Sequence, residues 1–305
     1  MILRIEALPI ALLMWMLTGV AGATAPVLGE KLEYTLKFRG FVTGFVELDI
    51  ARLTLDVERE LGRVAGTPAY VTNLRLTTEP YGKAEMLYPV RLSYRSWLDA
   101  SRLQPLIAVK SLKTRKEREE FFWFDRVTGL AYHYQTGDSE ASQPLTPPAS
   151  LQVVTALSNE RWSNLWQNQV IEIGDAEALD YISFLHRLRR MPLENGKGID
   201  FSAYNGKELE WFHADVSRER LIRAGWNLPA YRLRLWEVDL ESGKRHGEVN
   251  LWLSDDERRV LVRFYAERAF GAMEGILETG RPADGHDEGL SEATRSSLDT
   301  YLDLY

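Results

Sequence analysis

The stretch LWLSDDERRVLVRF, residues 251–264, decides the fold class, because apolar and polar side chains alternate on both sides of an acidic turn. Side chains of a β-strand point alternately to its two faces, so the pattern predicts two antiparallel strands joined by a short turn. Val249, Leu251 and Leu253 share one face of the first strand. Trp252 falls on the other face, among polar residues, where an indole ring needs an explanation.

The same period of two recurs along most of the chain. It predicts further strands at about 32–38, 46–50, 69–77, 88–98, 106–112, 119–125, 130–135, 199–204, 209–216, 231–240 and 272–277, besides those at 247–253 and 260–267. Short strands in direct succession are typical of an antiparallel meander rather than of alternating strands and helices. We therefore expect a mainly β protein with a single antiparallel curved sheet or partial barrel.

One main helix is predicted over residues 175–191, to be packed against this sheet. Its apolar stripe consists of Ala178, Tyr181, Ile182, Leu185 and Leu188. Asp175 and Glu177 suit the positive end of a helix dipole, and Arg190 suits the negative end. The spacing of Trp162, Leu165 and Trp166 also indicates a shorter helix within residues 151–168.

The first 23 residues predict a signal peptide. Arg4 precedes a run of about 14 apolar residues, and Ala21-Gly22-Ala23 supplies the small residues that a signal peptidase requires. An uncleaved anchor is the alternative, although such a run is shorter than the roughly 20 residues of a membrane-spanning helix. We expect cleavage near Ala23 and a periplasmic location, with no membrane span after cleavage. The mature chain is then a single β-rich domain, residues 24–279, with a loop or helical insertion at 137–173 and an acidic, mobile tail at 280–305.

The composition narrows the function. The 305-residue chain has a net charge of −7, which argues against a general attraction to nucleic acid or anionic lipid. It contains no cysteine, so thiol catalysis, thiolate metal sites, disulfides and a lipoprotein anchor at the cleavage point are excluded. Folding must therefore rest on the burial of apolar surface.

Four motifs carry a resemblance to a known family. They are GEKLEYTLKFRGFVTG (29–44), YRSWLDASRLQPL (94–106), FDRVTG (124–129) and LWLSDDERRVLVRF (251–264). In this order the chain resembles the bacterial exported family called domain of unknown function 3108, over residues 29–279. The resemblance implies an exported, mostly antiparallel β domain similar to periplasmic lipoprotein carriers. It implies no activity and no catalytic residue, and the stretch 137–173 and the tail depart from the family's pattern.

Signatures of catalysis are missing from the sequence. There is no G-x-S-x-G, H-E-x-x-H, P-loop or G-x-G-x-x-G motif, and the five histidines are scattered. We therefore expect no enzyme, no catalytic residue, no metal site and no cofactor. Asp255, Asp256 and Glu257 are compatible with a calcium site, but a hairpin turn explains them better, because Arg258 and Arg259 follow at once and Ser254 and Asp255 suit turn positions.

The second face of three adjacent strands mixes arginines with aromatic rings. The predicted ligand-binding residues on it are Arg232, Arg234, Trp236, Trp252, Arg263 and Tyr265. One interpretation is structural: the helix 175–191, or the stretch before it, covers part of this face, with arginines stacked on the rings. The other is that a concave sheet presents these side chains as an amphipathic groove, in which rings provide contact area and arginines hold a carboxylate, a phosphate or a glycan hydroxyl.

The preferred hypothesis is a non-enzymatic periplasmic binding or carrier module for an amphipathic cell-envelope ligand, lipid-like or glycan-like. A structural or protein-interaction factor of the envelope, docking a protein partner through 137–173 or the acidic tail, is the alternative. An envelope hydrolase comes third, because no nucleophile, base and orienting group can be named together.

Overall fold

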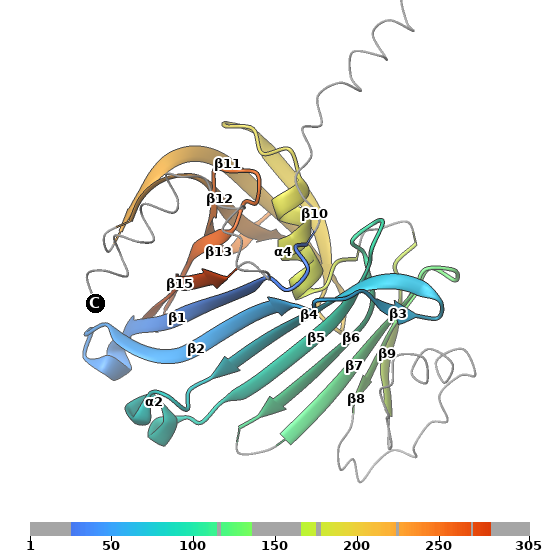
Figure 1. Ribbon diagram of the computed structural model, residues 1–305, viewed down its shortest axis with the longest axis horizontal. Coiled ribbons are helices and arrows are strands. Elements are labelled where there is room, and N and C mark those ends of the chain that lie inside the picture. The colour runs from blue at the N-terminus through green and yellow to red at the C-terminus, as the bar shows by residue number, and fades with distance from the viewer. Residues whose placement is uncertain are drawn as a thin grey trace, which may run out of the picture.

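The computed structural model describes residues 26–114, 117–135, 166–174, 178–223, 226–269 and 271–281. Within them the chain forms an antiparallel sheet of fifteen strands, which curves around a helix (Figure 1). The strands are β1 (Lys31–Gly40), β2 (Leu48–Val57), β3 (Gly62–Val64), β4 (Thr67–Thr77), β5 (Arg91–Asp99), β6 (Pro105–Lys113), β7 (Glu117–Asp125), β8 (Leu130–Gln135), β9 (Trp166–Glu172), β10 (Gly198–Tyr204), β11 (Leu209–Arg223), β12 (Trp226–Val238), β13 (Arg245–Ser254), β14 (Leu261–Arg268) and β15 (Gly271–Arg281). The helical elements are η1 (Phe41–Thr43), α2 (Gly82–Leu87) and α4 (Tyr181–Arg190).

The strands follow one another in the sheet almost as they do in the sequence. Their order is β10-β11-β12-β13-β14-β15-β1-β2-β4-β5-β6-β7-β8-β9, and β3 pairs with β4 alone. The pairing of β15 with β1 joins the two halves of the chain, with Tyr34 opposite Leu277. Among the described strands β9 and β10 form the two ends, so the sheet is open. This confirms the expected mainly β, curved antiparallel sheet.

Alternation along the strands gives the sheet an inner face, toward α4, and an outer face. Leu233 of β12 lies opposite Val216 and Leu251 on the neighbouring strands. All three are buried in the main core together with Ile182 and Leu188 of α4. Because each such side chain removes apolar surface from water at roughly 25 cal/mol per Å², the concavity of the sheet is the principal source of stability.

Helix α4 is shorter at its start than the predicted 175–191. Its N-cap is Asp180, whose carboxylate accepts hydrogen bonds from the backbone N–H groups of Ile182 (3.1 Å) and Ser183 (2.6 Å). Ser96 of β5 donates to the same carboxylate. Leu179 already pairs with Ala203 in an isolated bridge. The buried cap therefore makes Tyr181 the first residue of the helix. The apolar stripe alone could not show this start, because the stripe begins before Tyr181.

The predicted helix within 151–168 is wrong where the structure describes it. Residues 166–168 belong to β9, whose Trp166 lies opposite Gln135 of β8. Backbone pairing with the last strand of the meander outweighs the local spacing of tryptophans, because an unpaired strand edge leaves N–H and C=O groups unsatisfied. The other residues of this prediction lie outside the described part of the chain.

Helix α2 and strand β3 were not predicted, and the strand expected at 88–98 begins only at Arg91. Six helical residues are too few to display a period of 3.6, so the sequence carries no clear signal for α2. The last strand continues to Arg281, so it includes the first two residues of the expected tail.

Residues 1–25 and 282–305 lie outside the described ranges, and so do residues 137–165 of the predicted insertion. Signal peptide, tail and insertion therefore stay predictions. Within the described residues, no helix combines the length and the apolar character needed to cross a membrane.

Candidate functional site

The six predicted ligand-binding residues do lie together. Trp252 of β13 is directly opposite Arg232 of β12 on one side and Arg263 of β14 on the other. Arg234, Trp236 and Tyr265 share this face on β12 and β14. The face is, however, the outer one, because the intervening residues such as Leu233 and Leu251 point into the main core toward α4. The expected concave groove of arginines and rings is therefore wrong.

Trp252 is enclosed by the protein's own arginines. The guanidinium carbons of Arg263 and Arg232 lie 4.2 and 5.4 Å from its ring centroid, and its indole Nε1 donates to Glu219 at 2.7 Å. The residue is only 5% exposed although it lies on the outer face. Cation–π contacts of this kind stabilise by about 0.5–2 kcal/mol each. The ring therefore has a structural role, and the indole on the outer face is explained.

The arginines of this face are also neutralised internally. Arg234 forms an ion pair with Glu248 (3.2 Å), and Arg263 with Glu274 (2.5 Å). Arg232 donates to the side-chain oxygen of Asn250 at 2.9 Å. An anionic ligand would have to compete with these carboxylates. The structural interpretation is confirmed as far as the stacking goes, but α4 covers the opposite face of the sheet.

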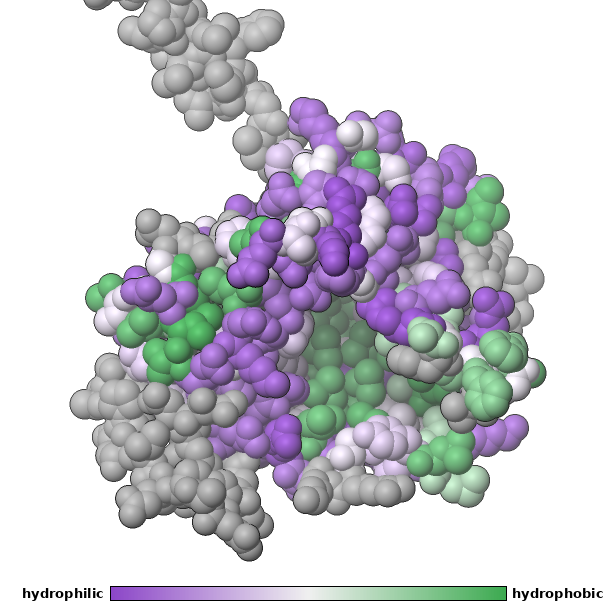
Figure 2. Space-filling view, turned by 180° about the vertical axis from the view of Figure 1, so that it is seen from behind, coloured by the Kyte–Doolittle hydropathy of each residue, from purple (hydrophilic) through white to green (hydrophobic). Residues whose placement is uncertain are grey.

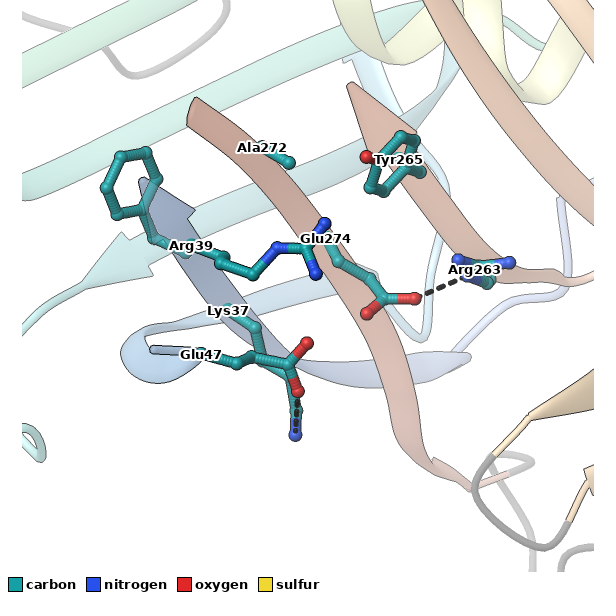
Figure 3. Close-up of a pocket in the computed structure, with 8 residues that line it drawn as sticks. Lys37, Arg39, Glu47, Arg263, Tyr265, Ala272 and Glu274 are labelled. Carbon is teal, nitrogen blue, oxygen red and sulfur yellow. Dashed lines mark hydrogen bonds and ion pairs between the residues drawn. The ribbon is translucent and has the colours of Figure 1, made fainter. Parts of the chain in front are cut away.

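A polar hollow of about 290 Å³ borders this face at β14, β15 and β1. Figure 3 shows its side chains, with Arg263 bonded to Glu274 and Lys37 bonded to Glu47. The guanidinium of Arg39 has no ion-pair partner among the described residues. A single unpaired cation beside two internal ion pairs gives a weak basis for specific recognition.

The acidic stretch 255–257 forms the expected hairpin turn. The Asp256 carboxylate accepts hydrogen bonds from the backbone N–H groups of Arg258 and Arg259, at 3.0 and 2.9 Å, and from the hydroxyl of Ser254. Asp255 instead pairs with Arg218. Across the described ranges, no three acidic or histidine side chains are grouped to hold a metal ion.

A polar cluster is buried farther along the inner face. Glu120 accepts from Lys110 and hydrogen-bonds His133, both at 3.1 Å. Burial by itself would raise the pKa of Glu120, but the bond to His133 and the charge of Lys110 lower it to about 2. None of these groups lines the polar hollow, and none lines the apolar hollow described next. They satisfy one another inside the fold.

A second hollow, of about 340 Å³, lies on the inner face and is almost wholly apolar. We call it the inner hollow. Its wall comes from β1, β2, β4, β15 and the segment around α2, and its apolar side chains include Leu36, Ile50, Leu76, Leu87, Val90 and Met273. Figure 2 shows the molecule hollowed on this side, with hydrophobic residues on the floor and hydrophilic residues above it.

The inner hollow exists because α4 covers only part of the sheet. A helix of ten residues is about 15 Å long. On β4, Thr72 contacts His186 of α4, whereas Leu76, about 13 Å farther along the strand, lines the hollow. Leu76 is only partly buried and packs against the main core. The hollow is thus the uncovered end of the core.

Helix α2 forms the lip of the inner hollow and is anchored by ionic contacts. Arg91 at the start of β5 donates two hydrogen bonds of 2.9 Å to the carboxylate of Glu85. Thr78 donates to the same group at 2.5 Å. The hydrogen bonds from Arg91 and Thr78 lower the pKa of Glu85, so it is ionised at neutral pH. These bonds hold Ala84 and Leu87 over the hollow.

Besides Asp49, which pairs with Lys37 at 3.6 Å, Lys83 places a charge at this apolar site. It lines the inner hollow from α2 and is exposed to solvent. It has no ion-pair partner among the described residues, in contrast to Lys37 and Arg91 nearby. An apolar cavity with a few polar groups at its edge is the usual form of a small-molecule site.

The comparisons with known proteins place the chain in a family. The family model described as "Protein of unknown function (DUF3108)" matches residues 33–278. The chain belongs to this family. The resemblance noted in the sequence is therefore confirmed. A comparison with curated proteins found no match.

Among solved structures, the fold is similar to "Beta-barrel-like Protein of Domain of Unknown Function DUF1849" from Brucella abortus. The TM-score is 0.49 at 10% sequence identity, and the match covers 85% of this chain and 99% of the other.

The inner hollow of this family member was missed in the sequence for two reasons. Its strands were predicted, but alternation alone does not show which part of an inner face a helix leaves open. Its lip, α2, was not predicted at all. A usable signal was the apolar run Met86-Leu87-Tyr88 directly before Pro89, which is more hydrophobic than a plain connecting loop requires.

Proposed function

We propose that this protein is an exported, non-enzymatic binding module that takes the acyl chain of an amphipathic molecule into the inner hollow. The observation that carries the proposal is the apolar hollow of about 340 Å³ on the inner face, a volume within the roughly 300–1,000 Å³ of ligand pockets. The periplasmic location comes from the sequence of residues 1–23 and belongs to the proposal as well.

The apolar lining favours a hydrocarbon chain over a glycan. Each buried methylene contributes about 0.8 kcal/mol, so a chain of ten carbons yields about 8 kcal/mol when fully buried. That corresponds to micromolar affinity before the cost of ordering the ligand is subtracted. A glycan would leave its hydroxyl groups without partners against Leu36, Leu76 and Met273, and unmatched buried polar groups are costly.

Lys83 suits the polar end of such a ligand. Its ammonium group lies on the lip of the inner hollow and has no ion-pair partner among the residues described. A carboxylate or phosphate at the end of the chain would meet this charge in a largely solvated place. Charge pairing there contributes little to affinity and mainly sets the direction in which the chain enters.

The test is a fluorescence titration with 11-(dansylamino)undecanoic acid. Met273→Glu places a charge on the wall, and Ala84→Trp fills the space under α2. Both are expected to weaken probe binding by about tenfold or more. The matched control is Met86→Glu, on the same short helix, because Met86 is 79% exposed and does not line the hollow.

The control is expected to bind the probe within about twofold of wild type, since an exposed substitution leaves the wall unchanged. Equal affinities for wild type, Met273→Glu and Ala84→Trp would refute the proposal. Circular dichroism and urea unfolding of each variant establish that a lost affinity is not lost folding.

A further inference from the structure

Large apolar side chains project from the mouth of the inner hollow. Phe41 and Phe45 in the β1–β2 connection are 81% and 68% exposed, and Met86 and Leu87 on α2 are 79% and 65% exposed. Val46 and Tyr88 extend the same two groups. Six of the thirteen exposed large hydrophobics of the described residues are gathered here. Patches of this kind mark an interaction surface.

Both groups border the same opening. Thr43, within the β1–β2 connection, and Leu87 and Tyr88, at the end of α2, all line the inner hollow. Figure 1 shows the β1–β2 connection and α2 at the same end of the sheet. We call these six side chains, Phe41, Phe45, Val46, Met86, Leu87 and Tyr88, the apolar rim.

The β1–β2 part of the rim is held in one conformation. Phe45 has a φ of 62°, in the left-handed region that bulky residues seldom adopt. Its N–H donates to the Gly40 carbonyl at 2.9 Å, and the Gly44 N–H donates to Phe41 at 3.0 Å. A strained and hydrogen-bonded turn that exposes two phenyl rings is consistent with a functional role, because strain persists at sites that use it.

Two unpaired cations flank the rim. Arg39 precedes the β1–β2 connection and Lys83 lies on α2, and both are exposed without an ion-pair partner among the described residues. The acidic residues next to them are already paired, Glu47 and Asp49 with Lys37, and Glu79 and Glu85 with Arg91. The rim therefore has apolar tips beside two cations that no carboxylate pairs, although the four cations and four carboxylates around it carry no net charge and the chain as a whole has a net charge of −7.

We propose that the apolar rim inserts into the surface of an anionic lipid bilayer, so that the mouth of the inner hollow faces the membrane. Apolar side chains enter the boundary between headgroups and acyl chains, and cations beside them attract anionic lipids. A second copy of the chain fits less well, because Arg39 and Lys83 of one copy would lie against the same cations of the other, and like charges repel. If the inner hollow binds an acyl chain, as proposed above, the membrane is the surface from which the chain would enter. Insertion of the rim itself does not depend on a chain bound in the hollow.

Vesicle co-sedimentation tests the proposal with the full chain. The vesicles contain phosphatidylglycerol and phosphatidylcholine in equal amounts, or phosphatidylcholine alone. The rim variant is Phe41→Ser/Phe45→Ser/Met86→Ser. Its matched control is Val127→Ser/Ile222→Ser/Leu240→Ser, three exposed apolar residues outside the rim. All proteins share the same N-terminus, so differences between them report the rim.

We expect the rim variant to lose about tenfold or more of its binding to anionic vesicles, and the control to bind as wild type does. Arg39→Gln/Lys83→Gln should reduce binding to anionic vesicles and leave the weak binding to neutral ones unchanged, with Lys207→Gln as its control. Equal sedimentation of rim variant and control would overturn the proposal. The proposal would also be overturned if the wild-type protein self-associated without vesicles and the rim variant did not. The partner of the rim would then be a second copy of the chain.

The two proposals fail separately. Phe41, Phe45 and Met86 do not line the inner hollow, so the rim variant should still bind 11-(dansylamino)undecanoic acid. Met273→Glu should bind vesicles as wild type does. Loss of vesicle binding with retained probe binding therefore reports on the rim alone, and the reverse reports on the hollow alone.

Discussion

Arg189, in the last turn of α4, donates hydrogen bonds of 2.7 and 2.9 Å to the two carboxylate oxygens of Glu30, which directly precedes β1. Arg258 of the β13–β14 turn donates to the same carboxylate. All three side chains are buried. The contact joins the helix to the strand at the centre of the sheet, 159 residues away in the sequence. It fixes which part of the inner face α4 covers, and so which part stays open.

Removing the carboxylate should therefore destabilise the fold. Glu30→Ala leaves Arg189 and Arg258 buried without their anion, which costs about 3–5 kcal/mol of unfolding free energy. Glu33→Ala is the matched control, since Glu33 pairs with Lys31 at a partly exposed position and should cost less than about 1 kcal/mol. Urea unfolding measures both. A loss for Glu30→Ala no larger than that of the control would refute the structural role of this ion pair.

Acid should destabilise the protein in two steps. Burial, and then the charge of Arg189, lower the pKa of His186 to about 3, so below about pH 6.5 the unfolded chain binds a proton that the folded chain does not. Burial alone would raise the pKa of Glu30, but Arg189 and Arg258 lower it to about 2. Its stabilising effect is complete above the unfolded pKa of about 4.5 and is lost as the pH falls from there toward 2.

We expect unfolding free energy to fall by up to about 1.4 kcal/mol per pH unit from His186 between pH 6 and 4.5, and more steeply below. His186→Leu should remove the first slope and keep the second. Urea midpoints measured from pH 7.5 to 4 test this. A wild-type and a variant curve that run parallel over the whole range would contradict this, because they would show that the pKa of His186 is the same in the folded and the unfolded protein.

The tryptophan of the outer face should matter for stability and not for ligand binding. Trp252→Ala removes a buried ring that two arginines contact, which should cost about 3–5 kcal/mol. Trp252→Phe keeps most of the packing and loses the bond to Glu219, for about 1 kcal/mol. Titration of Trp252→Phe with 11-(dansylamino)undecanoic acid should give the wild-type affinity. If this variant bound the probe ten times more weakly, the ligand would have to bind on the outer face, beside the arginines.

A close contact between two strands should not tolerate a methyl group. Phe264 of β14 lies opposite Gly275 of β15, and a Cβ atom at Gly275 would come within 2.1 Å of the phenyl ring. The ring must move into space that the Tyr34 ring, with its centroid 6.2 Å away, partly occupies. Gly275→Ala is therefore expected to cost about 1–3 kcal/mol by urea unfolding. Gly82→Ala, where a Cβ meets nothing within 4 Å, is the control.

The sequence predicted the sheet well because alternation is a local property of each strand. The β13–β14 hairpin shows this: Leu251 and Leu253 are buried in the core, and the turn is closed by Asp256 as well as by Ser254. The same information cannot show which face of the sheet is concave. That depends on where α4 packs, and the ion pair between Glu30 and Arg189 that fixes it joins distant parts of the chain.

The candidate site was misplaced for a related reason. The arginines and rings of the outer face looked like ligand groups because their partners on neighbouring strands were not evident in the sequence. In three dimensions Glu219, Glu248 and Glu274 neutralise them. The inner hollow could not be recognised for another reason. Its residues, such as Ile50 and Leu76, are those of an ordinary core, and they stay partly exposed only because α4 ends before it reaches them.

A crystal structure of the protein with 12-bromododecanoic acid would test the central claim most directly, because the anomalous signal of bromine locates the end of the chain. We predict a bromine peak inside the inner hollow, among Leu36, Leu76 and Met273. A peak beside Trp252 on the outer face, or a hollow filled by the protein's own side chains with no bromine in it, would contradict the account.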